Sequence, residues 1–273
     1  MNLKVAARIA GRELRGGLEG FRIFLLCLAL GVAAIAAVGS VRMAVQQGLL
    51  QEGAVLLGGD AAMQFTYRYA SDEELNWMAD TADAVSEIVD FRSMVVVDRD
   101  GVTDRGLTQV KAIDSLYPLK GEAILEPDIP LDLALSGEVP GAVMQQVLID
   151  RLGLQVGDIF RLGTQDFRLT AALVREPDGA GGGFSLGPRT IVRTEALANS
   201  GLLEPGTLFE TEYRHALPAD ATLAALKSEA EGRFRDSGLR WRDSRNGEPG
   251  VANFVERMGA FLVLVGLAGL AVG

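Results

Sequence analysis

The sequence has one cysteine, one histidine and few aromatic residues, and these shortages exclude several kinds of site. The single cysteine, Cys27, has no partner for a disulfide within the chain and cannot build a zinc site of the cysteine type. The single histidine, His215, lies in an expected strand without other metal-ligand types around it, and we interpret it as a partly exposed sheet residue. Nothing else has the spacing of a usual metal site. We therefore expect no metal and no cofactor bound by this chain.

Negative charge outnumbers positive charge beyond the first 42 residues. The formal net charge is −10, yet residues 1–42 hold six Lys or Arg side chains against two carboxylates, Glu13 and Glu19. The excess acid lies downstream, where no basic patch with interleaved aromatic residues occurs. Proteins bind nucleic acid through such patches. We therefore expect no nucleic-acid partner.

Long apolar runs occur only near the two ends of the sequence. The first, Ile23 to Val41, is 19 residues without a charge, and as a helix it would extend about 28 Å, enough to cross a bilayer. Five of the six cations precede it, which places the N-terminus in the cytoplasm and the acidic domain outside. We expect a transmembrane helix over residues 21–42 and an extracytoplasmic domain over residues 43–250.

A cleaved signal peptide is the alternative interpretation of this run, since Ala37-Val38-Gly39 has the small residues of a cleavage site. Its charged flank of about 22 residues and its own length both exceed those of a signal peptide, so we favour an uncleaved helix. The second run, Met258 to Gly273, stops without a polar flank. We interpret residues 256–273 as the start of a second transmembrane helix, truncated in a fragment of a longer protein.

Small residues in both runs are candidates for helix packing, because they let transmembrane helices approach closely. Glycine is also common in such helices without this role, and both interpretations stay open. The candidates are Gly31, Gly39, Gly266, Gly269 and Gly273.

The first 20 residues have the pattern of an amphipathic basic helix, with apolar and basic side chains recurring at steps of three and four. Such a helix lies on an anionic membrane surface. The charges can alternatively serve only to set the topology, or form a docking surface for a cytoplasmic partner. The candidate membrane-facing or ATPase-facing residues are Lys4, Arg8, Arg12 and Arg15.

The domain between the apolar runs is expected to have an α+β fold made of two β-α-β units around an inserted block. In the first unit, Ser71 to Glu74 has the form of a capping box, with the apolar residues Leu75, Met78 and Ala79 on one face of the helix. The carboxylates Asp72, Glu73 and Glu74 are interpreted as caps and solvated surface. The expected strands are Met63 to Tyr69, Ile88 to Val97, Leu107 to Ile113, Thr207 to Ala216 and Leu239 to Asp243, with a second helix over Asp220 to Phe234.

The inserted block, residues 115–205, is expected to be mainly β, with a short helix ending near Arg151 and strands around Ile159 to Leu162 and Phe167 to Val174. Gly183 to Gly187 matches the G-x-S-x-G nucleophile elbow around Ser185, but an elbow requires a strand before it and a helix after it. Glycines precede Ser185 and Pro188 follows it, so we expect no catalysis here. The glycines of this expected mobile loop are Gly179, Gly181, Gly182 and Gly183.

Several short motifs resemble the MacB/FtsX-type permeases of ABC transporters. They are Leu57-Gly58-Gly59-Asp60, Leu152 to Asp158, Arg175-Glu176-Pro177-Asp178, and Phe184 to Arg189. The last two are most similar to the YbbP-type branch. The resemblance implies a split porter-like subdomain, residues 55–114 and 206–245, with residues 115–205 inserted as a sabre-like subdomain.

The resemblance further implies a permease subunit in the bacterial inner membrane, with its main domain in the periplasm. A YbbA-like cytoplasmic ATPase would be a separate subunit that binds the ATP, and this chain would not be an enzyme. Export or extraction of hydrophobic or lipid-like compounds is the expected activity, with membrane lipids as neighbours. The alternative is an FtsX-like scaffold that regulates a periplasmic hydrolase or adaptor.

Overall fold

The computed structural model describes residues 53–99, 101–179, 187–204 and 206–246, together with a few helical residues between 29 and 43. The chain divides into two units, residues 1–48 with 249–273, and residues 49–248. The predicted helices of residues 1–20 and 256–273, and most of residues 21–42, lie outside the described residues. Within the described part, no helix is long and apolar enough to cross a membrane.

The second unit is built on one mixed sheet of ten strands, which gives the α+β fold that the sequence predicts. The strand order is β10-β1-β9-β2-β3-β8-β5-β7-β4, and β6 pairs with β2 and β7 beside this path. The strands are β1 (Ala61–Thr66), β2 (Ala84–Arg99), β3 (Val102–Ile113), β4 (Ile124–Glu126), β5 (Gly141–Gln145), β6 (Ile159–Leu162), β7 (Gln165–Arg175), β8 (Arg189–Arg193), β9 (Phe209–Ala216) and β10 (Arg240–Asp243).

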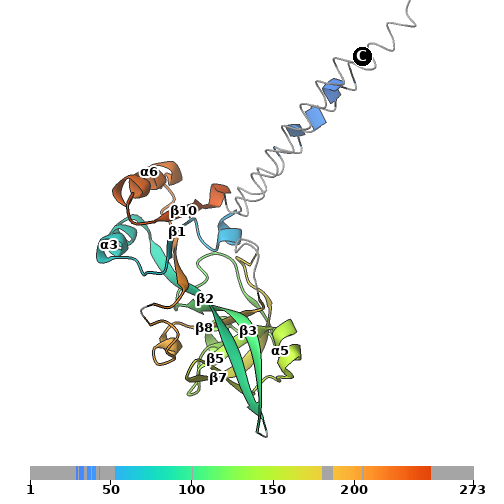
Figure 1. Cartoon of the computed structure of the whole chain (residues 1–273). Helices are drawn as coiled ribbons and strands as arrows, with labels where there is room; N and C mark the ends of the chain where they lie inside the picture. Colours follow the sequence, from blue (N-terminus) through green and yellow to red (C-terminus); the bar gives the residue numbers. More distant parts are fainter. Residues whose placement is uncertain are drawn as a thin grey trace, which may run out of the picture. The chain divides into compact units, whose positions relative to one another are not determined.

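Two helices, α3 (Asp72–Thr81) and α6 (Leu223–Arg233), lie together beside the β10-β1-β9 end of the sheet (Figure 1). The core between them and the strands contains Met63, Phe65, Trp77, Tyr213 and Phe234. Burying each of these large side chains contributes about 1.5–3 kcal/mol. The two predicted β-α-β units are therefore confirmed, and antiparallel pairing of β1 and β2 with β9 joins them.

The predicted insert supplies β4 to β8 and two short helices, α4 (Leu131–Ala134) and α5 (Gln146–Leu152). Helix α5 ends at Leu152 and is capped by Gly153, whose φ of 59° is the left-handed conformation that glycine favours at this position. The helix contacts β3, β5 and β7 and lies beside β3 in Figure 1. Its residues Leu148 and Leu152 belong to the buried core. The short helix near Arg151 and the two predicted strands are confirmed.

The strands of the insert continue the same sheet. Strand β8 pairs in parallel with β3, from Gln109 opposite Arg189 to Ile113 opposite Arg193. Strand β6 also pairs with the outer part of β2, at Val95 and Val96. Backbone hydrogen bonds therefore run without a break from the split unit into the insert.

The buried face of α3 differs from the predicted one. Leu75 and Ala79 are exposed, whereas Glu74, Trp77 and Met78 are buried. The prediction followed apolar character alone, but Glu74 is drawn inward because Arg68 pairs with its carboxylate at 2.7 Å. The capping box is confirmed in both directions, since Glu74 N–H donates to Ser71 and Ser71 N–H donates to Glu74.

The first predicted strand extends too far. Strand β1 ends at Thr66, and Tyr67 has a φ of 61°, which turns the chain out of the extended conformation. The alternation of aromatic and polar residues continues to Tyr69, but the strand does not. Both Tyr67 and Tyr69 are exposed.

The interpretation of His215 as partly exposed is wrong. Its exposed fraction is 0%, because the side chain lies on the face of β9 that α3 and β10 cover with Trp77 and Trp241. A strand residue alternates between faces, and the sequence alone did not reveal which face was covered.

Candidate functional site

Charged side chains cross the opposite face of the sheet in a continuous row. On β9, Thr211, Tyr213 and His215 point toward the helices, so Glu212 and Arg214 point to the other face. We call the row the charge ladder; its members, from β10 to β2, are Arg242, Glu212, Arg214, Asp178, Lys111, Glu176, Arg189 and Asp90. Signs alternate along the ladder, and five of its members are buried: Lys111, Asp178, Arg189, Glu212 and Arg214.

Lys111 on β3 is the centre of the charge ladder. Its ammonium group lies 2.6 Å from the Glu176 carboxylate and 2.8 Å from the Asp178 carboxylate. Tyr117 donates its hydroxyl hydrogen to the other oxygen of Asp178 at 2.5 Å. The Lys111 ammonium is also 3.5 Å from the Tyr117 hydroxyl. These contacts supply a buried ammonium with the acceptors that its removal from water requires.

Arg214 extends the ladder toward β10. Its guanidinium contacts Asp178 on one side and Glu212, at 3.2 Å, on the other. Burial opposes its charge, but Glu212 and Asp178 raise its pKa above the ordinary value. Arg242 on β10 then lies 3.7 Å from Glu212. This arm ties β9 and β10 to the segment that follows β7.

Arg189 extends the ladder toward β2. Its Nε donates to Glu176 at 3.2 Å, and its terminal nitrogen contacts Asp90. Arg189 is the first residue of β8 and the last residue of the motif Phe184 to Arg189. This arm therefore joins β8 of the insert to β2 of the split unit.

The charges of the ladder balance, with four cations against four carboxylates. Burial would raise the pKa of Asp178, but Lys111 and Arg214 hold it well below the usual range of a carboxyl group. Such a network is costly to disrupt, because removing one partner leaves another charge buried and unpaired. Its arrangement suits a rigid junction rather than proton transfer.

The segment before the sheet, residues 53–60, packs directly on the charge ladder, and we call it the lead-in segment. Gly58 has a φ of 71°, and a Cβ atom there would lie 2.3 Å from the Arg214 guanidinium. Asp60 N–H donates to the carbonyl of His215 at 2.8 Å, and Asp60 accepts from Leu217 N–H at 2.9 Å. The lead-in segment is therefore fixed to β9 beside the ladder.

The lead-in segment also reaches the insert. A Cβ atom at Gly121 would meet Pro177 at 2.6 Å and Val55 at 3.0 Å, so these three residues pack together. Lys120 lies 3.7 Å from Asp60. Leu57 to Asp60, Glu176 to Asp178 and Arg189 all belong to motifs that carry the permease resemblance, and the fold brings them to one place.

The remaining motif, Leu152 to Asp158, lies elsewhere. It forms the turn after α5, where Asp158 accepts a hydrogen bond from Gln155 N–H and pairs with Arg99 at 3.2 Å. This turn fastens α5 to the end of β2. Neither of these two interactions involves a residue of the charge ladder.

Most of the predicted site residues lie outside the described residues: Lys4, Arg8, Arg12, Arg15, Gly181, Gly182, Gly183, Gly266, Gly269 and Gly273, as does Ser185. Gly31 and Gly39 are helical, and a Cβ atom at Gly39 would meet nothing within 4 Å. Their packing role stays a prediction. Gly179 is described next to the ladder, with its N–H 3.4 Å from the Glu176 carbonyl.

The charge ladder was not predicted from the sequence, although a signal was present. Lys111 interrupts an apolar strand pattern, and Glu212 and Arg214 alternate with Thr211, Tyr213 and His215 along β9. Charged residues at such positions are rarely buried unless they are paired. The pairing itself joins residues far apart in sequence, such as Lys111 and Asp178.

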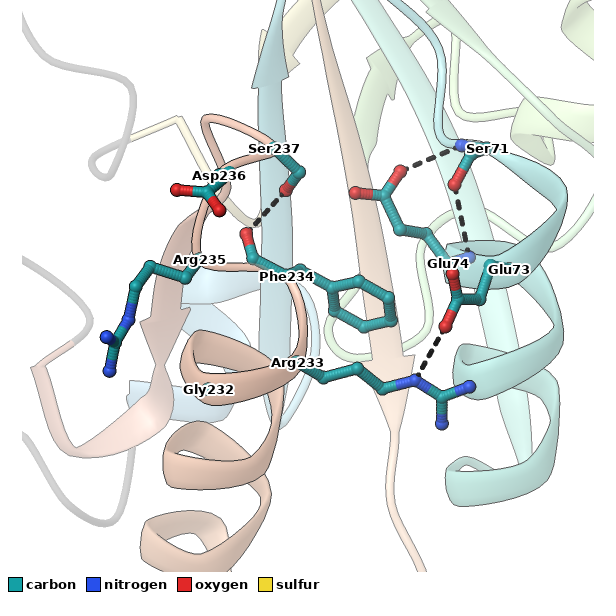
Figure 2. A pocket seen from close by; sticks show the side chains of 9 residues that line it. All are labelled: Ser71, Glu73, Glu74, Gly232, Arg233, Phe234, Arg235, Asp236 and Ser237. Carbon is teal, nitrogen blue, oxygen red and sulfur yellow. Dashed lines mark hydrogen bonds and ion pairs between the residues drawn. The ribbon is translucent and has the colours of Figure 1, made fainter.

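An open pocket lies between the start of α3 and the end of α6 (Figure 2). Its polar groups bond to one another: Arg233 pairs with Glu73 at 2.9 Å, and the Ser237 hydroxyl donates to the Phe234 carbonyl at 2.8 Å. The interpretation of Glu73 as solvated surface is confirmed, whereas Glu74 is buried. In the described part of the chain, no cluster of three His, Cys, Asp or Glu side chains could hold a metal.

The chain is similar to one curated protein of the permease class. This relative, the uncharacterized ABC transporter permease YbbP of Escherichia coli (strain K12), is 25% identical over 195 residues, which are 70% of this chain and 23% of the relative. The chain thus spans about a quarter of the length of the curated relative that it matches. The similarity confirms the predicted resemblance to YbbP-type permeases. No protein-family model matches the chain.

The fold is also similar to two solved structures, with TM-scores below 0.5. The periplasmic region of MacB from Actinobacillus actinomycetemcomitans has a TM-score of 0.46 and 10% identity, over 75% of this chain and 98% of that one. The extracellular domain of the noncanonic ABC-type transporter YknZ from Gram-positive bacteria has a TM-score of 0.43 and 12% identity, over 67% and 99%. At these TM-scores neither likeness carries a functional conclusion.

Proposed function

We propose that this chain, which resembles the YbbP-type permeases, is the first periplasmic unit of an ABC transporter permease with its flanking membrane helices. In this proposal residues 21–42 and 256–273 span the bacterial inner membrane, and residues 43–250 lie in the periplasm. A separate YbbA-like ATPase binds and hydrolyses ATP on the cytoplasmic side. The chain itself is not an enzyme and transmits motion across the membrane.

One observation carries this proposal: at the charge ladder, the lead-in segment contacts both the split unit and the insert. Residues 53–60 follow the expected first span in sequence, and Gly58 packs against Arg214. From Arg214, ion pairs continue through Asp178 and Lys111 to Arg189. A displacement of the lead-in segment would therefore act on β9, β3 and β8 together.

The physical reason for rigid transmission is the cost of separating buried charges. Breaking one buried pair costs about 3–5 kcal/mol, because the partner that remains is desolvated and unpaired. The continuous hydrogen bonding from β9 through β2 and β3 to β8 acts in the same direction. We infer that the split unit and the insert move as one body during a transport cycle.

Hydrophobic or lipid-like compounds are the proposed cargo, exported or extracted from the membrane beside the periplasmic unit. The alternative activity is an FtsX-like scaffold that regulates a periplasmic hydrolase. The same rigid junction would serve both activities, since each requires a periplasmic response to a cytoplasmic ATPase. The two differ in what the periplasmic unit acts on.

The test uses the full-length permease with its cytoplasmic ATPase in proteoliposomes that contain a fluorescent lipid probe. ATP hydrolysis and ATP-dependent probe release are measured for the wild type, for Asp178→Asn and for the control Asp166→Asn, whose carboxylate is exposed on β7. We expect Asp178→Asn to lower release per ATP at least tenfold and Asp166→Asn to leave it unchanged.

Two results would contradict parts of this proposal. Unchanged release per ATP in a correctly folded Asp178→Asn variant would show that the charge ladder does not couple ATP hydrolysis to release of the probe. Absence of release by the wild type, together with a periplasmic hydrolase whose activity requires residues 43–250, would favour the scaffold.

A further inference from the structure

His215 lies inside an aromatic cluster on the helix-covered face of the sheet. Its ring centroid is 6.4 Å from that of Trp77 on α3 and 6.1 Å from that of Trp241 on β10. The two tryptophan rings are themselves 6.4 Å apart, and Phe234 packs edge-on against Trp77 at 5.9 Å. The imidazole therefore packs between Trp77 of α3 and Trp241 of β10, and Phe234 at the end of α6 packs on the same tryptophan, Trp77.

Neither ring nitrogen of His215 has a hydrogen-bond partner in the described structure. A neutral imidazole tolerates this environment at a moderate cost, because it exposes one N–H and one acceptor to apolar surroundings. An imidazolium would bring two N–H donors and a full charge into the same space. The site is therefore built for the neutral ring.

The titratable and charged groups on the elements packed around His215 have other partners. Glu229 on α6 accepts from the Trp77 indole at 2.9 Å, and Asp243 on β10 accepts from the Trp241 indole at 3.0 Å. The others are Glu74 on α3, Asp60 before β1, Glu87 on β2, which hydrogen-bonds to Tyr213, Tyr213 itself on β9, and Arg245 after β10. No described carboxylate hydrogen-bonds to the ring to stabilise its cation.

We propose that His215 is an acid-sensitive element, whose protonation loosens α3, α6 and β10 from the sheet while the insert stays folded. The core around Leu148, Phe160 and Phe167, which the insert shares with β2 and β3, contains no histidine. The lead-in segment is bonded to the backbone of His215 through Asp60. We call α3, α6 and β10 the helix layer. Acid would thus release the helix layer next to the place where the lead-in segment joins the sheet.

The sign of the effect follows from the burial of the ring, which lowers the pKa of His215 to about 4. In the unfolded chain histidine titrates near pH 6.5. As the pH falls below 6.5, the unfolded or opened state gains protons that the closed layer does not, so the closed layer loses stability until about pH 4. The shift corresponds to a loss on the order of 300-fold in the closing equilibrium.

The composition makes this proposal directly measurable. The full sequence has one histidine and two tryptophans, and both tryptophans are in this cluster. Tryptophan fluorescence of the full chain in detergent micelles therefore reports this layer. The single histidine also gives one set of imidazole signals by NMR.

The experiment titrates the wild type and His215→Phe from pH 7.5 to 3.5 by fluorescence, with hydrogen exchange followed separately in α3, α6 and α5. We expect the wild type to change its emission and lose protection in α3 and α6 between pH 6.5 and 4, while α5 stays protected. His215→Phe, which keeps an aromatic ring without a charge, should not change until lower pH, where Glu74 is protonated.

Results that overturn the proposal are equally defined. An ordinary histidine pKa near 6.5 by NMR in the folded wild type would show that the site accepts the cation, and this measurement needs no variant to fold. Identical acid profiles for the wild type and His215→Phe, or simultaneous loss of protection in α5 and α6, would also overturn it.

Discussion

Lys111 on β3 and Asp178, which follows β7, form a buried ion pair at 2.8 Å. Strands β3 and β7 are separated in the sheet by β8 and β5. The segment from Arg175 to Asp178 must therefore cross over the sheet face for the carboxylate to reach the ammonium group. This crossing makes Asp178 a node between strands that are not neighbours.

Asp178→Asn should lower the free energy of unfolding by about 3–5 kcal/mol, because Lys111 and Arg214 would lose a buried counter-charge. Chemical denaturation of the full chain in detergent measures this change. The control Asp166→Asn, at an exposed position, should shift it by at most about 0.5 kcal/mol. Equal effects of the two substitutions would mean that the ladder contributes little.

Gly58→Ala should destabilise the protein more than Gly101→Ala. Both glycines have positive φ, 71° and 81°, so both substitutions carry a backbone cost of about 1–2 kcal/mol. Only at Gly58 would the new Cβ meet a guanidinium, that of Arg214 at 2.3 Å, whereas nothing lies within 4 Å at Gly101. We expect an additional loss of about 1–3 kcal/mol from this contact, measured by thermal or urea unfolding, and equal losses would contradict it.

Glu74→Gln should cost about 2 kcal/mol at pH 7, since it removes the charge that Arg68 pairs with and weakens the cap at Ser71. Burial would raise the pKa of Glu74, but the hydrogen bonds from Arg68 and Ser71 lower it overall. This stabilisation is present above the ordinary carboxyl pKa and is lost as the pH falls through the lower folded value. The difference between wild type and variant should therefore shrink toward pH 3.

The matched control for this substitution is Glu73→Gln. Glu73 is exposed and pairs with Arg233 at 2.9 Å on the rim of the pocket in Figure 2. An exposed pair contributes about 0–1 kcal/mol. If Glu73→Gln proved as costly as Glu74→Gln, the buried position of Glu74 would not explain the effect.

Tyr67→Asn should raise the free energy of unfolding by about 0.5 kcal/mol, because asparagine tolerates the left-handed conformation better than tyrosine. Tyr67 is 60% exposed, so little packing is lost. Tyr69→Asn should instead lower stability, since the Tyr69 ring lies 5.1 Å from the Phe209 ring. Thermal unfolding of the two variants distinguishes them, and a loss at Tyr67 would indicate an unrecognised contact.

The order of strands and helices could be predicted where residues alternate or recur with a clear period. In β9 the alternation is complete, because one face packs on helices and the other on the charge ladder. The capping box at Ser71 is a local pattern and was also predictable. The inner face of α3 was not, because a distant arginine decides the burial of Glu74.

The charge ladder could not be assembled from the sequence for a related reason. Asp90 and Arg189 are 99 positions apart, and Lys111 and Asp178 are 67 apart. Charge alternation in one strand gives the face of each side chain but not its partner. Three of the four motifs of the permease resemblance meet at the charge ladder, and this convergence depends on the parallel pairing of β3 with β8.

This parallel pairing also limits how the gene can be cut and recombined. Residues 115–205 follow β3 in sequence and form β4 to β8, of which β8 is hydrogen-bonded to β3 itself. Replacing that stretch with its counterpart from another permease would replace β8, the strand next to Lys111. It would also replace three members of the charge ladder, Glu176, Asp178 and Arg189. Functional chimaeras should therefore require β3 and β9 to be inherited from the same parent as the stretch between them.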